Sequence, residues 1–200
     1  MIRVVPIDRG NWREAVAAFG NPALELMARA YVFGEPAPAL EYDGDELVGL
    51  RTLDGMEYPT DVIDSSEPWV KRQIDEYVAT DGAAPKFPGG APLVLLTYQG
   101  RKSGQWRRTC LIGAEHNGVY LLVASYGGAD KHPAWYPNLV ENPSAWLQVG
   151  PDVIPVVAST ATPEEKPALY EFMTGLYSGY AEYQQKTSRD IPVVILTPVP

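Results

Sequence analysis

The sequence predicts a mainly β fold: a small barrel of about six short strands with helices at its periphery. Short apolar runs bounded by glycine, proline or asparagine recur from residue 93 onward. One pair of runs brackets His116-Asn117-Gly118, and Asn-Gly between apolar runs is a strong hairpin signal. The spacing does not fit alternating strand–helix units, and no G-x-G-x-x-G follows a strand, which disfavours a Rossmann domain.

The first third of the chain differs from the rest in charge. Residues 1–66 hold twelve acidic and five basic residues, whereas residues 67–200 hold thirteen and eleven. Because the composition changes there, we predict that residues 1–66 form an acidic extension and residues 67–200 the barrel domain. Inside the extension, 11–19 and 22–33 each begin at an asparagine and predict short helices, while 34–66 fit either a hairpin or an ordered loop.

Helical spacing predicts a helix over residues 67–79, with Trp69, Ile74, Tyr77 and Val78 in its pattern and Ser65 or Ser66 as its cap. Strands are predicted at 93–97, 107–113, 119–125, 146–149, 153–158 and 191–197.

Two more helices are predicted in the barrel domain. One covers residues 133–142, with Pro133 in its first turn. The other opens at Thr162-Pro163-Glu164-Glu165, where a threonine cap, a proline and acids form a start signal, and continues toward Tyr177. We expect Gly175 and Gly179 to bend or break it.

Composition excludes several classes of protein. The single cysteine, Cys110, leaves no intrachain disulfide and no multi-cysteine zinc site, and two histidines make a metal centre unexpected. The net charge of −9 argues against nucleic acid as the main partner. There is no apolar leader, and no apolar run reaches the roughly eighteen residues of a membrane span. We therefore predict a cytoplasmic protein.

A cation-rich segment, Gly100–Arg108, follows the first barrel strand. Arg101, Lys102, Arg107 and Arg108 lie here without any acid, and glycines at 100 and 104 allow a tight turn. Arginine binds phosphate or carboxylate through two parallel hydrogen bonds, and lysine adds a point charge. The segment is either an anion pocket or a solvated turn that favours solubility.

A glycine-rich loop, Ser125–Ala129, follows the third barrel strand and leads toward a helix that begins near Pro133. Backbone N–H groups in such a loop favour anions. The alternative is a plain strand–turn–helix connection with Trp135 and Tyr136 in the core.

Four tyrosines, Tyr170, Tyr177, Tyr180 and Tyr183, recur at near-helical spacing. Their rings and hydroxyls suit a pocket that stacks a planar substrate and donates a hydrogen bond. Packing of a helix face on the barrel is the alternative. Cys110 has no general base near it in the sequence and is expected to be a buried strand residue.

In combination, three blocks of sequence resemble the deazaflavin-dependent nitroreductase family, which is of actinobacterial type. They are LLTYQGRKSGQWRRTCL, VYLLVASYGGADKHPAWYPNLVENPSAWLQVG and YEFMTGLYSGYAEYQQKTSRDIPVVILTP, and they occur in the family's order within residues 67–200. The resemblance implies a split β-barrel of the kind that binds flavin mononucleotide (FMN), and coenzyme F420 as hydride donor.

The resemblance also implies roles for particular residues. The coenzyme would be bound by Arg101, Lys102, Ser103, Gly104, Arg107, Cys110, Leu111, Ser125, Tyr126, Gly127, Gly128, Ala129, Trp135, Tyr136 and Asn138. The substrate would meet Tyr177, Tyr180, Tyr183 and Trp135, with Tyr180, Ser125 and Tyr177 as the catalytic group.

The implied reaction is hydride transfer from reduced coenzyme F420 (F420H2) to a planar, electron-poor acceptor: a quinone, a conjugated enone or a nitroheteroaromatic. An FMN-dependent reductase and a non-catalytic ligand carrier are the alternatives, and a homodimer is possible for such barrels. Two positions depart from the family pattern: Tyr126 stands where a lysine is common, which leaves Lys131 or Arg108 to compensate, and Cys110 stands where a proline is common. Tyr126 and the acidic extension favour a conjugated carbonyl or quinone, rather than a nitro compound, as acceptor.

Overall fold

A computed structural model describes residues 2–6, 38–43, 46–52, 58–85 and 87–199. The chain forms two compact units, Met1–Tyr58 with Val199–Pro200, and Pro59–Pro198. In the first unit, three strands form an antiparallel sheet in the order β1-β2-β3: β1 (Ile2–Pro6), β2 (Pro38–Asp43) and β3 (Glu46–Thr52). Residues 38–52 thus take the hairpin alternative; the helices predicted at 11–19 and 22–33 lie outside the described residues.

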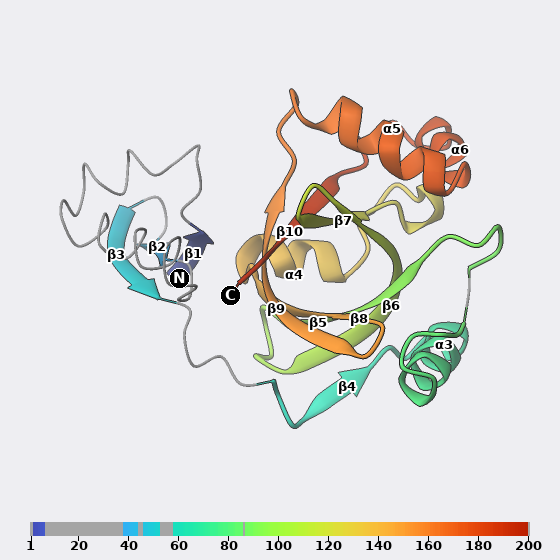
Figure 1. The fold of residues 1–200 in the computed structure, drawn as a ribbon. Coiled ribbons are helices and arrows are strands. Elements are labelled where there is room, and N and C mark those ends of the chain that lie inside the picture. Colours follow the sequence, from blue (N-terminus) through green and yellow to red (C-terminus); the bar gives the residue numbers. More distant parts are fainter. Residues whose placement is uncertain (1, 7–37, 44–45, 53–57, 86, 200) are drawn as a thin grey trace. The chain divides into compact units, whose positions relative to one another are not determined.

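The second unit is a closed barrel of six antiparallel strands, drawn in Figure 1. Its strands are β5 (Leu93–Gln99), β6 (Trp106–His116), β7 (Val119–Val123), β8 (Ser144–Val149), β9 (Asp152–Thr160) and β10 (Val193–Pro198). They pair in the order β6-β5-β8-β9-β10-β7, and pairing of β6 with β7 closes the ring. The predicted barrel and all six of its strands are confirmed.

A short strand that the sequence did not reveal, β4 (Val62–Asp64), adds itself in parallel to the outer side of β6. Its residues lie opposite Trp106–Arg108 in the register. Because β4 precedes residue 66, part of the segment assigned to the acidic extension pairs with the barrel. Val62–Asp64 is only three residues long and ends in a charged residue, so its pattern of apolar and polar residues is too short to predict a strand.

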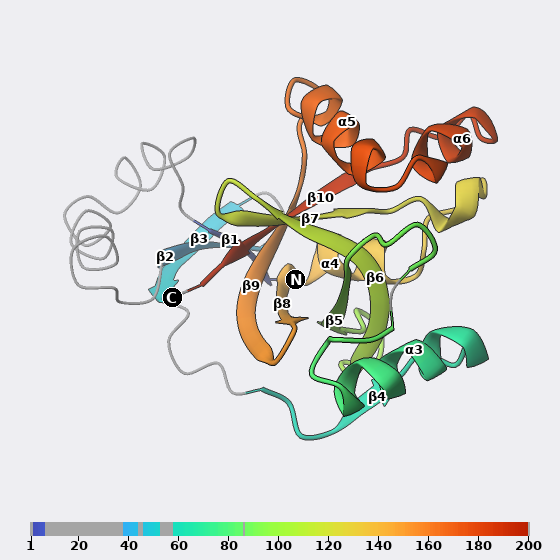
Figure 2. The ribbon, with the colours of Figure 1, turned by 45° about the vertical axis from the view of Figure 1, so that its right-hand side comes forward.

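Four helices accompany the barrel: α3 (Pro68–Ala79), α4 (Trp135–Glu141), α5 (Lys166–Leu176) and α6 (Gly179–Gln185). In Figures 1 and 2, α3 lies beside β6, whereas α5 and α6 lie beyond β7. The predicted break falls between α5 and α6. Gly179 is needed there because a Cβ at this position would come within 2.5 Å of the ring of Tyr177.

The first turns of α3 and α5 differ in detail from their predictions. The side chain of Ser65 accepts the N–H of Glu67, but Glu67 itself is the N-cap of α3 and makes no side-chain cap. Thr162 and Glu165 do exchange the two hydrogen bonds of a capping box, at 2.8 and 3.2 Å, in a turn that precedes α5.

Strand β5 is buried on both faces along nearly its whole length, and the central residues of β7, β8 and β10 are mostly buried as well, which explains their continuous apolar runs. One set of buried side chains, including Val94, Leu96 and Leu196, packs together with Trp135 and Leu139 of α4. Alternate residues on the strands, including Leu93, Leu95 and Cys110, pack instead with side chains of α3, α5 and α6. Two of the residues assigned to the helical pattern of α3, Trp69 and Val78, are exposed, and Val70 takes their place in the core.

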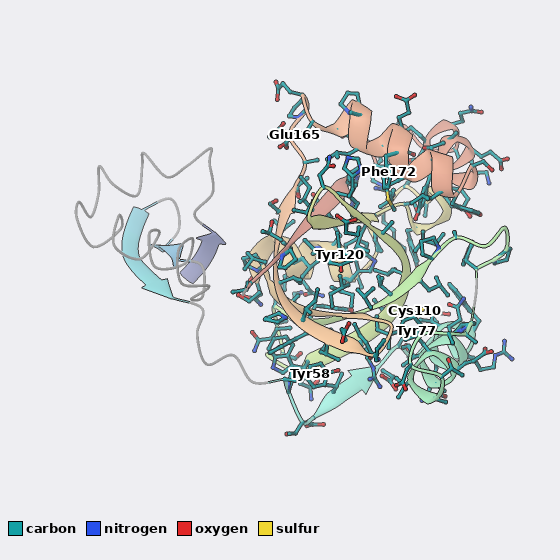
Figure 3. The ribbon with its side chains drawn as sticks, in the orientation of Figure 1. Tyr58, Tyr77, Cys110, Tyr120, Glu165 and Phe172 are labelled. Atoms are coloured by element: carbon teal, nitrogen blue, oxygen red, sulfur yellow. The ribbon has the colours of Figure 1, made fainter. Side chains whose placement is uncertain are left out.

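Tyr77 anchors α3 to the barrel. Its hydroxyl accepts the N–H of Gly150 at 2.8 Å and lies 3.4 Å from the carbonyl of Gln148, so it bridges to the turn between β8 and β9. Figure 3 shows Tyr77 beside Cys110, and both belong to the same buried cluster. Burial raises the pKa of the Tyr77 hydroxyl, which therefore stays protonated.

Candidate functional site

A cavity of about 910 Å³ lies over β5, β6 and β7, between α3 and α6. The two helices stand on opposite sides of β6 in Figure 2. A volume of this order suits a small-molecule site. The predicted site residues that line it are Arg107, Cys110, Leu111, Ser125, Tyr126, Gly127, Trp135, Asn138, Tyr177, Tyr180 and Tyr183.

The cation-rich segment splits into residues that line the cavity and residues that do not. Arg107 and Arg108 line it, whereas Arg101, Lys102, Ser103 and Gly104 lie on the turn between β5 and β6. Gly104 has a φ of 68°, and its N–H donates to the carbonyl of Gly100 at 2.7 Å, so the glycines close a tight turn as expected.

Two of the four cations are paired with carboxylates. Arg101 lies 3.3 Å from Glu141, and Arg108 lies 2.7 Å from Asp64. Among the described residues, Arg107 and the exposed Lys102 have no carboxylate partner. Arg107 and Lys102 therefore retain a charge that can meet an anionic ligand.

Asn138 links this segment to the cavity. Its amide donates to the carbonyl of Ala134 at 2.8 Å, and its Oδ1 accepts the backbone N–H of Arg101 at 3.0 Å. Asn138 thus fixes the start of the cation-rich turn from a position in the cavity wall.

The glycine-rich loop adopts a left-handed backbone conformation, which glycine takes without strain. Three successive residues have positive φ: Tyr126 (48°), Gly127 (65°) and Gly128 (83°). A Cβ on Gly128 would come within 2.7 Å of the carbonyl oxygen of Tyr183, whereas one on Gly127 would meet nothing within 4 Å. Gly128 therefore packs against α6, while Ser125, Tyr126 and Gly127 line the cavity.

The cation missing at position 126 is partly replaced. Tyr126 is half exposed, and the ammonium of Lys131 lies 5.7 Å from its ring centroid. Arg108, the other candidate, is held by Asp64.

Two predicted cofactor residues lie deeper, and a third lies apart. Trp135 is buried in the barrel core, with part of its surface on the cavity. Cys110 is 4% exposed, and burial raises the pKa of its thiol to about 12, so it presents an unreactive sulfur. Tyr136 does not line the cavity; its hydroxyl and that of Thr160 are 3.1 Å apart.

The predicted tyrosines form one packed cluster on α5 and α6. Tyr177 contacts Tyr180 edge-on, with ring centroids 5.3 Å apart, and the hydroxyls of Tyr177 and Tyr183 are 3.0 Å apart. The Tyr170 hydroxyl donates to the carbonyl of Tyr180 at 2.7 Å and does not reach the cavity. The hydrogen bond to Tyr177, together with burial, raises the pKa of Tyr183 to about 12.

Tyr180 is 4% exposed, and burial raises its pKa far above that of free tyrosine. Among the described residues, the hydroxyls of Tyr180 and Ser125 have no hydrogen-bond partner, although both residues line the cavity. Neither hydroxyl oxygen is among the fully buried polar atoms that lack a partner, so both are reached from the cavity and can donate to a ligand there.

Sequence reasoning missed several residues of the site. Tyr98 lines the cavity from an apolar strand run that gave no sign of it, and Trp69 and Gln73 line it from α3. Asp64, on β4, contributes the carboxylate that binds Arg108. No local motif marks these residues, because the fold brings them to the site from separate segments.

Fold and site together define a class: a split β-barrel with a largely apolar cavity that is lined by arginines and by tyrosine side chains. Residues 69–198 match the family model of the F420H2-dependent quinone reductases. The chain belongs to this family, and it is therefore an oxidoreductase whose cofactor is coenzyme F420.

Individual relatives agree. An F420H2-dependent quinone reductase of Mycobacterium tuberculosis is 39% identical over 115 residues, which are 56% of this chain and 77% of that protein. A solved F420H2-dependent reductase is 44% identical, with a TM-score of 0.50 over 52% of this chain and 93% of its own. A second structure, described as a domain-swapped dimer, is 41% identical with a TM-score of 0.52, over 66% and 99%. The resemblance to F420-dependent reductases that the sequence indicated is confirmed. The family model describes quinone reductases, whereas the resemblance was stated for the nitroreductase family.

The cavity fits this coenzyme. A deazaflavin ring is flat and largely apolar, and its tail carries phosphate and carboxylates. The apolar wall of β5 and β6 suits the ring, and the unpaired charges of Arg107 and Lys102 suit an anionic tail.

Proposed function

We propose that this protein reduces quinones with F420H2, and that conjugated enones are its second class of acceptor. The observation that carries the proposal is the pair of partnerless hydroxyls, Tyr180 and Ser125, in a cavity near unpaired cations. A quinone is planar and apolar, and its carbonyl oxygens gain negative charge during reduction.

The coenzyme would be held from both sides of the cavity. Arg107 and Lys102 would meet its anionic tail, with Arg101, Ser103 and Gly104 shaping the turn that carries Lys102. Ser125–Ala129 would approach the ring by backbone contacts, and Leu111, Cys110 and Trp135 would pack beside it. When bound in reduced form, the coenzyme supplies a hydride.

The chain's own part in the reaction is electrostatic. The Tyr180 hydroxyl, fixed by packing against Tyr177 and kept protonated by burial, would donate to the acceptor oxygen as charge develops there. Ser125 would offer a second donor. Tyr177 and Tyr183, whose hydroxyls already contact each other, would shape the acceptor pocket and relay a proton from solvent.

The test is turnover. Purified full-length protein with F420H2 would be assayed against a benzoquinone, a naphthoquinone, a cyclic enone and a nitroimidazole, with oxidation of the coenzyme as readout. We expect the quinones to react fastest. Exclusive reduction of the nitro compound would refute the proposed acceptor class, and ligand binding without turnover would identify a carrier. Tight FMN binding without F420 binding would instead support an FMN reductase.

Two further expectations concern the oligomeric state and the location of the protein. A homodimer is proposed because one related structure is described as a domain-swapped dimer; light scattering would test it. None of the helices in the described part of the chain has the length and apolar character that crossing a bilayer requires. A cytoplasmic location stays a prediction.

A further inference from the structure

Arg189, which lies between α6 and β10, makes an unusual set of hydrogen bonds. Its Nε donates to the carbonyl of Ala129 at 3.1 Å, and one terminal nitrogen donates to the backbone carbonyl of Ser125 at 2.9 Å. The other terminal nitrogen lies 3.3 Å from the carbonyl of Ala124. This last nitrogen also lies 3.1 Å from Nδ1 of His132. One guanidinium thus holds both ends of the glycine-rich loop.

The segment around Arg189 is itself tied to α6. Gln184, on α6, donates to the carbonyl of Arg189 at 2.8 Å and accepts the N–H of Ile191 at 3.0 Å. Thr187 adds a second link to the loop by donating to Asp130 at 2.8 Å. The helix that carries Tyr180 and Tyr183 is therefore joined through residues 184–191 to the loop that carries Ser125.

The charge of Arg189 has no carboxylate partner among the described residues. Guanidinium is a donor only, so the Nδ1 atom of His132 must accept its hydrogen bond. His132 is then neutral, with its proton on Nε2. Burial, and secondly the charge of Arg189, lower the pKa of His132, which favours the same neutral form. His132 lines the cavity, so Nε2–H is a donor it can offer there.

We propose that Arg189 is the positioning residue of this site. It holds the left-handed loop Ser125–Ala129 at a set distance from α6, and it fixes His132 as a neutral Nε2–H donor. The reasons are geometric. The loop has three consecutive positive φ values. The carbonyls of Ala124, Ser125 and Ala129 all point to the side chain of Arg189. Only a planar guanidinium has enough N–H donors, in the right directions, to bind all three carbonyls at once.

The first test needs no ligand and does not depend on the proposed function. Nitrogen-15 and proton NMR of the imidazoles would report the tautomer of His132, assigned by comparison with a His116→Gln variant. We expect the Nε2–H tautomer in the wild-type protein and a rise in the pKa of His132 in Arg189→Met. An Nδ1–H tautomer in the wild-type protein would overturn the pairing.

The second test rests on the proposed function. Arg189→Lys keeps the charge but loses the planar guanidinium, so it cannot satisfy the carbonyls of Ala124, Ser125 and Ala129 together. The Kd for F420 should then rise about tenfold, because binding would have to order the loop at a cost of roughly one hydrogen bond to a charged group. The kcat for a quinone should fall with little change in the quinone KM. Arg72→Met, on the exposed face of α3, is the matched control and should leave both values unchanged.

The outcomes separate cleanly. Wild-type coenzyme affinity and kcat in both Arg189→Lys and Arg189→Met would overturn the positioning role. Full activity in Arg189→Lys alone would also overturn it, because charge rather than geometry would then suffice. If the wild-type protein binds no F420, the proposed function fails, while the NMR result still decides the Arg189–His132 pairing. Circular dichroism of each variant would show that the fold is retained.

Discussion

The cation-rich segment Gly100–Arg108 and the tyrosine cluster of α5 and α6 are built in opposite ways. Part of each region lines the cavity: Arg107 and Arg108 of the first, and Tyr177, Tyr180 and Tyr183 of the second. The cations lie on a turn or at a half-buried strand end, and Lys102 is exposed to solvent. The tyrosines are packed ring against ring, and Tyr180 is almost wholly buried. Charges on exposed side chains are screened by salt, and the side chains can move to meet a ligand. Buried hydroxyl dipoles already have their orientation before a ligand binds. We infer that the first region sets coenzyme affinity and the second sets the rate of reduction.

The largest expected effect is a loss of stability at Gly128, where the loop Ser125–Ala129 contacts α6. Gly128→Ala combines a positive φ with a contact of 2.7 Å to the Tyr183 carbonyl, so it should lower the free energy of unfolding by about 3 kcal/mol. Chemical denaturation would measure this. Gly127→Ala, which has the positive φ but open space, should lose only about 1 kcal/mol. Equal losses in the two variants would show that backbone strain alone matters.

The next effect should separate rate from affinity. Tyr180→Phe removes the partnerless hydroxyl and should slow kcat about 10- to 100-fold, the range for loss of one donor to a developing charge, with coenzyme affinity nearly unchanged. Stopped-flow kinetics and a binding titration would measure the two quantities. Tyr170→Phe is the control, because that hydroxyl binds the Tyr180 carbonyl outside the cavity. A normal rate in Tyr180→Phe would remove Tyr180 from the mechanism.

A substitution in the cation-rich segment should change coenzyme affinity rather than kcat, and by a smaller factor. Lys102→Ala should raise the Kd for F420 several-fold, about 1 kcal/mol, because Lys102 is exposed and screened. The difference should shrink as salt concentration rises. Arg72→Ala, remote from the cavity, is the control. Unchanged affinity in Lys102→Ala at low salt would argue against an anion site on this turn.

The smallest effect concerns pH. The pKa of Tyr183 is raised from 10.0 to about 12, mainly by its hydrogen bond to Tyr177. A raised pKa in the folded state gives stability that is complete below pH 10 and is lost as pH rises through about 12. The thermal midpoint of the wild-type protein should therefore fall over this interval, and that of Tyr183→Phe should fall less. Tyr126→Phe, which alters an exposed ring, should follow the wild-type protein.

Much of the barrel could be predicted because local signals and burial agree. Strand β5 and the central residues of β7, β8 and β10 are mostly buried, so their apolar runs stand out, and Asn117-Gly118 marks the hairpin between β6 and β7. The break in the last helix near Gly179 could also be predicted, because glycine interrupts the helical spacing of the tyrosines there. The short strand β4 was not, because its pairing with β6 supplies the stability that its own sequence lacks.

The candidate site was predicted less evenly. Ser125, Tyr177 and Tyr180 do share one cavity, but Tyr136 faces Thr160 and Arg101 is paired with Glu141. Spacing along a chain cannot show which charges are already neutralised, because the partners come from distant segments. Asp64 and Glu141 are separated from the arginines they bind by more than thirty residues.

By itself, the sequence determined the class of fold, the order of the strands along the chain, the coenzyme family and the two kinds of chemical group at the site, because each depends on local pattern or on motifs in fixed order. Only the tertiary structure decided which hydroxyls and which cations lack a partner among the residues it describes, and how Arg189 joins α6 to the loop Ser125–Ala129. These depend on contacts between residues far apart in the chain, and no local pattern records such contacts.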